Sequence, residues 1–331
     1  MPVIDLQKEL LNTIKNALPP HISLVDTLTD LLGLSYDSVY RRVRGEKPIT
    51  LNELKILCEH FHLSIDQLLQ LTSENVVFNA PTINGTDTDF TIYLNGLLEQ
   101  LKYFNSFGTK EMLHQCKDAP IFYFYLFPEI AAFKTFCWIK TIQNNPDYEN
   151  KIFSVEEFPF TACCEMGREI IKQYNILPTV ELWNYESFNS TINQIDYYYQ
   201  ANLFKKRSDF DKVLDSFEKM LSHLHDQTKT GKKYLPGDSN IADKTSFKLY
   251  INEVIMLNNT YTLNLDGNQQ SIITYNTLDY LITKDKRFNA KILHGFNSLL
   301  SKSTLISGTG EKERNRFFRV QQGKIERLRK L

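Results

Sequence analysis

The chain has 331 residues, of which 42% are hydrophobic and 23% charged, the composition of an ordinary globular protein with two or three domains. Its formal net charge of −1 excludes binding to polyanions through overall charge, so any nucleic-acid site needs a local basic surface. The longest apolar run, IFYFYLF at 121–127, is too short to span a bilayer, and no signal-peptide pattern opens the sequence. We therefore expect a cytoplasmic protein without membrane contact.

Five short helices are expected within residues 1–71. Apolar residues at helical spacing run through 3–18, and two consecutive prolines end that helix. Each later helix opens on a capping residue, and Gly45 closes the third helix at its C′ position. These start signals are Ser23 with Asp26, Ser35, Thr50 with Glu53, and Ser64 with Gln67. Because the connections are short, the sequence predicts a compact five-helix domain over residues 1–71.

Residues 72–89 gather Ser, Thr, Asn, Gly and Pro and lose helical periodicity, which indicates a linker. A larger helical region for sensing or interaction is expected over residues 90–245. Its predicted helices are 90–104, 110–115, 128–143, 163–174, 185–202 and 210–228. The run at 121–127 is strand-like, but the pattern leaves its structure ambiguous.

The sequence pattern changes from mainly helical to strand-forming in the first part of residues 246–331. Runs rich in β-formers at 247–256, 261–265 and 271–275 predict a small three-stranded antiparallel meander. The turn signals between them are Asn258–Asn259 and Asp266–Gly267–Asn268. Asn276 is expected to cap a helix through about Ile282, and further helices are expected over 287–300 and 311–330. The chain is thus predicted to be mainly α, with this meander and its terminal helices forming a last unit.

The pattern at 28–45, LTDLLGLSYDSVYRRVRG, is that of a helix-turn-helix. Gly33 permits the sharp turn, Leu34 fills the angle between the helices, and Val39 and Val43 face inward four residues apart. The second helix would then present its polar arc to DNA. The candidate contacts are Ser35, Tyr36, Asp37, Ser38, Tyr40, Arg41, Arg42, Arg44 and Lys47.

Local charge supports this interpretation modestly. Residues 36–48 hold four basic and two acidic side chains, a net of +2, whereas residues 1–70 hold seven basic and nine acidic ones, a net of −2. Positive potential must therefore be concentrated on one face of the domain.

Residues 28–69, LTDLLGLSYDSVYRRVRGEKPITLNELKILCEHFHLSIDQLL, resemble the helix-turn-helix domains of phage repressors of the Cro/cI or XRE type. The sequence pattern YRRxRGEKP, at residues 40–48, is most similar to the BetR-like group. The resemblance covers about residues 20–71. It implies a lambda-repressor-like fold, a recognition helix over about 35–44, and a role in transcription regulation.

Two positions depart from the pattern of that family. Val25 stands where such repressors usually carry a Gln that helps hold the DNA backbone. Arg42 stands where an inward residue is usual, with Val43 expected inward instead. If the roles of the recognition helix in that family are carried over to this chain, the residues nearest the bases would be Tyr36, Asp37, Ser38 and Arg41.

Other chemistry is weakly indicated. Three carboxylates, at Glu156, Glu157 and Glu165, have no nucleophile or metal partner near them in the sequence, so we expect no enzyme activity. The pair His223 and His225 has no third ligand at a recognisable spacing, so we expect no metal or cofactor. Residues 301–331 carry nine basic and three acidic side chains, which favours a packed helix with a basic face or an auxiliary phosphate contact.

The sequence favours a transcriptional regulator that binds double-stranded DNA as a homodimer, with a small-molecule or protein effector. The alternative is a helical interaction scaffold whose first domain docks protein rather than DNA.

Overall fold

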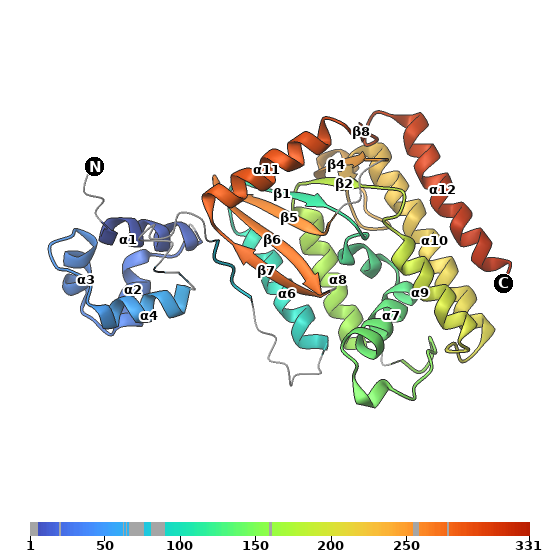
Figure 1. The fold of residues 1–331 in the computed structure, drawn as a ribbon, viewed down its shortest axis with the longest axis horizontal. Helices are drawn as coiled ribbons and strands as arrows, with labels where there is room; N and C mark the ends of the chain where they lie inside the picture. The colour runs from blue at the N-terminus through green and yellow to red at the C-terminus, as the bar shows by residue number, and fades with distance from the viewer. Residues whose placement is uncertain are drawn as a thin grey trace.

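The computed structural model describes residues 6–19, 21–61, 63, 65, 76–80, 90–158, 161–253, 258–276 and 278–331. A small helical domain at residues 6–61 and a larger domain at residues 90–331 lie side by side along an elongated molecule. The first domain occupies one end, and the C-terminal helix lies at the other (Figure 1).

Four of the five helices expected in the first domain are confirmed. They are α1 (Leu6–Ala17), α2 (Leu24–Leu32), α3 (Tyr36–Val43) and α4 (Leu51–Phe61). The helix predicted from Ser64 falls almost wholly outside the described residues. Leu28, Val39 and Leu57 form the centre of a separate small core, joined by Leu10, Leu11 and Ile14 of α1. Burial of these side chains stabilises helices that are too short to persist alone.

The larger domain contains seven longer helices among its described residues. They are α6 (Phe90–Asn105), α7 (Pro128–Cys137), α8 (Thr161–Ile176), α9 (Asn189–Gln200), α10 (Arg207–Thr230), α11 (Lys286–Leu300) and α12 (Glu311–Arg329). Short helical turns are η1 (Ile121–Leu126), η2 (Trp138–Ile142), η3 (Pro146–Tyr148) and η4 (Ile241–Asp243). The predicted helices are confirmed within a few residues at each end, with two exceptions: residues 110–115 and most of 276–282 form strands instead.

An eight-stranded mixed sheet corrects the expectation of a small three-stranded meander. Its strands are β1 (Lys110–Gln115), β2 (Thr179–Trp183), β3 (Lys232–Lys233), β4 (Thr245–Ile251), β5 (Thr260–Leu265), β6 (Asn268–Asn276), β7 (Asp279–Thr283) and β8 (Thr304–Leu305). Their order is β3-β4-β2-β1-β5-β6-β7, and β8 also pairs with β4. Strands β1, β2 and β4 are parallel neighbours, so helical crossovers connect them.

The meander exists, but it consists of β5, β6 and β7. The run predicted as its first strand forms β4, which lies beside β2 instead. The helix expected from Asn276 is wrong, because that segment returns as β7. The predicted turn at Asp266 and Gly267 is confirmed as a two-residue hairpin in which both residues have positive φ, 48° and 83°.

Two segments of the larger domain differ from their local pattern. Residues 110–115 were expected to be helical and form strand β1, because the central position between β2 and β5 buries Met112 and His114 on one face. The strand-like run at 121–127 begins with the 3-10 helix η1, and its aromatic rings enter the core. Short apolar runs do not distinguish helix from strand, so tertiary packing decides.

Part of the predicted linker pairs with the edge of the sheet. Asn79 exchanges backbone hydrogen bonds with Ile282 of β7, at N–O distances of 2.7 and 2.8 Å. The Thr283 hydroxyl donates to the carbonyl oxygen of Val77 at 2.8 Å, and Phe78 makes an edge contact with Phe288 of α11. The segment at 76–80 thus covers an edge that would otherwise offer unpaired backbone groups.

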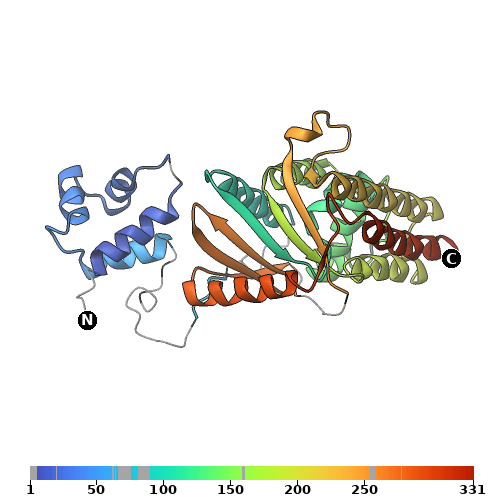
Figure 2. The same cartoon turned by 90° about the horizontal axis from the view of Figure 1, so that it is seen from above.

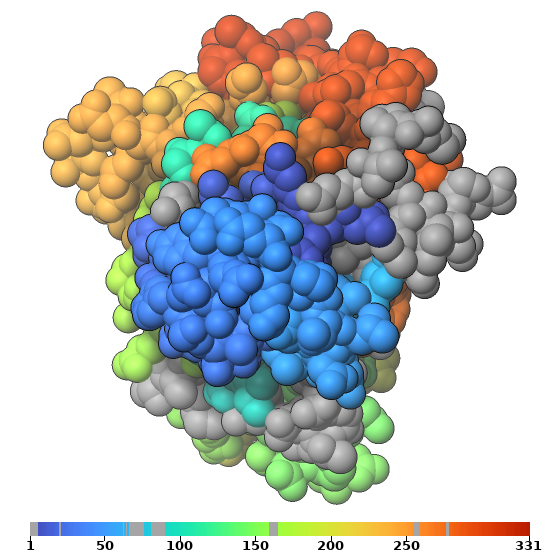
Figure 3. All heavy atoms as spheres, turned by 90° about the vertical axis from the view of Figure 1, so that its left-hand side faces the viewer, coloured from blue at the N-terminus to red at the C-terminus, as the bar shows by residue number. Residues whose placement is uncertain are grey.

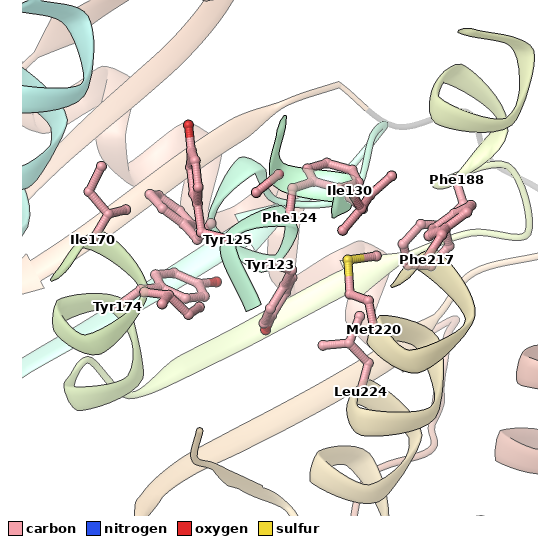
Figure 4. Close-up of a cluster of buried hydrophobic side chains, with 14 of the residues drawn as sticks. Tyr123, Phe124, Tyr125, Ile130, Ile170, Tyr174, Phe188, Phe217, Met220 and Leu224 are labelled. Atoms are coloured by element: carbon pink, nitrogen blue, oxygen red, sulfur yellow. The ribbon is translucent and has the colours of Figure 1, made fainter. Parts of the chain in front are cut away.

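The two faces of the sheet are covered unequally. Helix α11 lies on one face, where Phe296 packs against Val180 and Leu182 of β2 (Figure 2). A much larger aromatic core lies on the other face, and Figure 4 shows Tyr123 and Tyr174 pointing toward one another within it. Strand β2 contributes to both faces because successive side chains along a strand point to opposite sides of the sheet.

A buried carboxylate lies at the centre of that aromatic core. Glu181 of β2 accepts hydrogen bonds from the hydroxyls of Tyr123 at 2.8 Å and Tyr174 at 2.5 Å. It also accepts from the Thr179 hydroxyl at 3.1 Å and from Trp183 Nε1 at 2.9 Å. Four donors compensate the loss of water around the fully buried carboxylate.

The Lys233 amine is buried close to this carboxylate. Its Nζ donates to the carbonyl oxygen of Leu177 at 3.1 Å and lies 3.3 Å from the centre of the Tyr174 ring. Burial lowers the pKa of Lys233 to about 7, although the charge of Glu181 acts in the opposite direction. The larger domain therefore contains an amine that titrates near neutral pH.

Replacing Lys233 with methionine is expected to flatten the pH dependence of stability between pH 7 and 9. The unfolded lysine has a higher pKa than the folded one, so the unfolded chain binds more protons in this range. The contribution of Lys233 to the free energy of unfolding therefore increases as the pH rises from 7 toward the pKa of the unfolded lysine. The slope is at most about 1.4 kcal/mol per pH unit, and the contribution is lost as the pH falls toward 7. Urea unfolding followed by tryptophan fluorescence measures the slope; an equal slope in the methionine variant contradicts the assignment.

Candidate nucleic-acid interface

The turn between α2 and α3 has the geometry that the sequence predicted. The Ser23 hydroxyl caps α2 by accepting from the backbone N–H of Asp26 at 3.3 Å. Gly33 ends α2 in the left-handed conformation, with φ 61°, and its N–H donates to the carbonyl oxygen of Thr29. A side chain at this position would be strained by the backbone angle, so glycine allows the sharp change of direction.

Helix α3 begins at a confirmed cap and turns one face to the core. The Ser35 hydroxyl accepts from the Ser38 N–H at 3.4 Å and donates to the Ser38 hydroxyl at 3.1 Å. Val39 is fully buried, and Val43 packs partly buried against the same cluster. The opposite face of α3 lies at the end of the molecule farthest from the larger domain (Figure 1).

Most of the predicted contact residues lie on this outer face. Ser35, Tyr36, Asp37, Tyr40, Arg41, Arg44 and Lys47 are exposed, and Ser38 is half-buried. The two tyrosines are unusually open for large side chains, at 54% for Tyr36 and 48% for Tyr40. The exposed set holds three basic and two acidic side chains, counting Glu46, so its net charge is only +1.

Arg42 is the exception, and its expected outward position is wrong. Only 4% of the residue is exposed. Its Nε and Nη2 donate to the two carboxylate oxygens of Glu53 at 3.0 and 2.6 Å, and Nη1 donates to the carbonyl oxygen of Ser38 at 3.0 Å. All three nitrogens of the guanidinium are therefore engaged within the domain, which leaves Arg42 to join α3 to α4.

Glu53 combines two roles in this arrangement. Its carboxylate accepts from the backbone N–H of Thr50 at 2.9 Å, and the Glu53 N–H donates to the Thr50 hydroxyl at 3.3 Å, which completes the predicted capping box of α4. Burial acts to raise the pKa of Glu53, but the hydrogen bonds from Arg42 and Thr50 outweigh it and lower that pKa. The carboxylate thus stays charged opposite Arg42.

Gln7 of α1 is a positioning residue that the sequence reasoning missed. Its amide nitrogen donates to the carbonyl oxygens of Arg42 at 2.8 Å and Lys47 at 2.9 Å, and its amide oxygen accepts from the Ile49 N–H at 2.8 Å. These bonds bind the loop after α3 to α1. No local pattern marks the role, because its partners lie 35 to 42 residues away in the chain.

The exposed arginines are paired only at the surface. Glu46 lies 2.9 Å from Nε of Arg44 and 3.8 Å from Nε of Arg41. All three side chains are about half exposed, so water screens these ion pairs and each contributes little to stability. Phosphate oxygens can replace Glu46 as the partner of either arginine at small cost.

Tyr36 is held over the first helix of the motif. Its hydrogen bond with the Asp26 side chain is the main cause that raises the pKa of Tyr36, followed by the negative charge of that carboxylate. The phenol therefore stays protonated at physiological pH. It can act as a hydrogen-bond donor to a phosphate oxygen if Asp26 releases it.

Other predicted features resolve into packing. Helix α12 buries Phe317, Phe318 and Ile325 against α10, which confirms the packed interpretation of the basic segment. His223 and His225 contact the Tyr234 carbonyl oxygen and Asn315, respectively. Among the described residues, no group of three or more potential ligands could hold a metal ion, and no helix is long and apolar enough to cross a membrane.

A comparison with protein families gives a match to part of the chain. The sequence model of the BetR domain, a family associated with helix-turn-helix regulators, matches residues 9–155. The match begins in α1, includes the whole α2–α3 motif, and continues into the larger domain as far as the residues after η3. It supports the resemblance to the BetR-like group and extends it beyond residues 20–71. No curated protein and no solved structure matches the chain.

Proposed function

We propose that the chain is a sequence-specific DNA-binding transcriptional regulator, with α3 inserted in the major groove. The observation that carries the proposal is the capped helix-turn-helix whose outer face, at the far end of the molecule, presents Tyr40, Arg41 and Arg44 to solvent. The match to the BetR domain supports a regulatory role. The likeness to Cro/cI and XRE repressors stays a prediction.

The contacts follow from the exposure of each side chain. Arg41 and Arg44 suit guanine edges and phosphates, and Lys47 suits a phosphate. Tyr36 and Tyr40 can contact a phosphate or a thymine methyl group, while Asp37 and Ser38 can bind base edges at the helix start. We assign Arg42 a structural role instead, because Glu53 occupies its guanidinium.

A titration of fluorescent random-sequence duplex DNA with the full chain, over a series of salt concentrations, tests this proposal. Three phosphate-binding cations per copy predict a slope of log K against log salt of roughly −3 for a monomer and roughly −5 for a dimer. The double substitution Arg41→Ala with Arg44→Ala is expected to weaken binding and to flatten the slope by roughly 2 for each bound copy.

Lys15→Ala with Lys55→Ala is the matched control. These exposed lysines lie on α1 and α4 of the same domain, so the change in net charge is identical but α3 is intact. An unaltered slope in the arginine variant, or equal losses in both double variants, would contradict the recognition-helix assignment. No detectable binding at low salt would favour the alternative, in which the exposed tyrosines and arginines of α3 dock a protein.

The remaining parts of the proposal concern the assembly. We propose that the regulator acts in the cytoplasm as a homodimer, because one short recognition helix seldom provides sufficient affinity and two-fold operators match two-fold proteins. The larger domain would then dimerise or respond to an effector, without catalytic activity of its own.

A further inference from the structure

A cleft lies between the first domain and the larger domain. Its volume is about 490 Å³, which suits a small organic molecule better than a single ion. Figure 3 shows the first domain, in blue, in front of the larger domain, with orange residues of the larger domain beyond its upper edge. Both domains supply its walls. Thr13 and Asn16 come from α1, Tyr103 from α6 and Gln269 from β6, while Lys284 and Lys286 flank Asp285, the N-cap of α11.

The charged side chains that line this cleft are two lysines. None of the described residues that line it is Asp or Glu, and neither Lys284 nor Lys286 forms an ion pair within the described part of the chain. Two nearby carboxylates are already engaged. Asp285 caps α11 by accepting from the Phe288 N–H at 2.8 Å, and Asp266 accepts from the Thr109 N–H at 2.6 Å.

The remaining lining defines the kind of ligand. The amide side chains of Asn16 and Gln269 can donate hydrogen bonds to a ligand or accept them from it. The Thr13 hydroxyl donates to the Glu9 carbonyl oxygen at 2.9 Å, so it can accept a hydrogen bond from a ligand. Phe107 and Leu265 add apolar surface beside them. We propose that the cleft binds a small organic anion, whose carboxylate or phosphate group lies between the two lysines, and that the bound anion clamps the first domain to the larger one.

Clamping follows from how the domains are joined. Each has its own hydrophobic core, and the Tyr103 hydroxyl crosses between them by donating to the Ala17 carbonyl oxygen at 2.9 Å. A ligand that contacts both walls binds the docked form more tightly than the undocked form. This difference in affinity sets how far the ligand shifts the equilibrium toward the docked form. Because α3 lies at the far end, docking fixes the orientation of α3 without covering it. This regulatory meaning rests on the proposed function, whereas anion binding itself does not.

The first experiment measures binding to the full chain at constant ionic strength. The probes are inorganic phosphate, succinate, citrate, glucose 6-phosphate and AMP, each titrated while the melting temperature is followed. At least one organic anion is expected to stabilise the protein saturably. Lys284→Ala with Lys286→Ala is expected to weaken its binding at least about tenfold, as the loss of charged hydrogen bonds implies. The control, Lys212→Ala with Lys219→Ala on α10, is expected to bind like wild type.

The second experiment tests the clamp by hydrogen exchange. The anion is expected to protect both the last turn of α1 and the β5–β6 hairpin, since the two segments form opposite walls. The proposal is overturned if none of the organic probes binds saturably, if both double variants bind equally well, or if only one wall gains protection. The DNA titration is run separately with and without the anion, so a failure of DNA binding is distinguished from a failure of anion binding.

Discussion

Arg42→Ala is expected to destabilise the first domain by about 3–5 kcal/mol, because it leaves the charge of Glu53 without its partner in a largely buried position. Arg41→Ala, one residue earlier on the exposed face, is expected to change stability by no more than about 0.5 kcal/mol. The two substitutions are therefore expected to act differently. Arg42→Ala destabilises the domain that positions α3, whereas Arg41→Ala removes a proposed DNA contact from an intact domain.

The tryptophans allow this effect to be located. Both of them, Trp138 and Trp183, lie in the larger domain, so their fluorescence does not report unfolding of the first domain. In Arg42→Ala, circular dichroism is expected to show an early urea transition that tryptophan fluorescence lacks. Coincident, wild-type-like transitions in both signals would show that the Arg42–Glu53 pair is dispensable. Combining Arg42→Met with Glu53→Gln removes both charges, and it is expected to recover much of the loss.

Glu181→Ala is expected to have the largest effect on the larger domain, on the order of 4–6 kcal/mol. It removes the acceptor for four donors and leaves the hydroxyls of Tyr123 and Tyr174 and the Trp183 indole N–H buried without that partner. Such a loss approaches the whole stability of an ordinary domain. Urea unfolding followed by tryptophan fluorescence measures this loss, because both tryptophans lie in the larger domain.

Glu181→Gln keeps the prediction testable if the alanine variant does not fold. Three of the donors, including both tyrosine hydroxyls, bind the same carboxylate oxygen, Oε1. An amide oxygen in that position retains them and loses only the bond from Trp183 Nε1, so the loss is expected to be less than half of that in the alanine variant. Equal losses in the two variants would assign the effect to packing rather than to hydrogen bonding.

The first domain was predictable because its signals are local. Ser23, Ser35 and Thr50 cap helices through partners three residues away, and Gly33 marks the turn by its backbone freedom. Arg42 was assigned to the wrong face because both faces of a short amphipathic helix accept an arginine when a distant carboxylate is available. Glu53 was recognised as part of a capping box, but its second partner, eleven residues earlier, leaves no local pattern.

The sheet was less predictable, because its central strands are short and carry polar residues in the core. The sequence of β2, TVELW, contains Glu181, which interrupts the apolar run that a buried parallel strand usually shows. The six residues of β1 include His114, which is buried and stacked on Tyr261. Only long-range packing makes these side chains internal, so periodicity within the segment carries no sign of it.

The pairing of residues 76–80 with β7 also limits how far the first domain can move from the larger domain if it binds DNA as proposed. Because the chain is attached to the sheet at Val77, the path back to Leu63 is 14 residues long and spans at most about 50 Å when fully extended. Successive half-sites on one face of a duplex lie about 34 Å apart. In a dimer, the largest operator spacing would therefore be set by the distance between the two Val77 residues and by the length of the two paths. If the domains stay docked, a dimer would accept only one spacing.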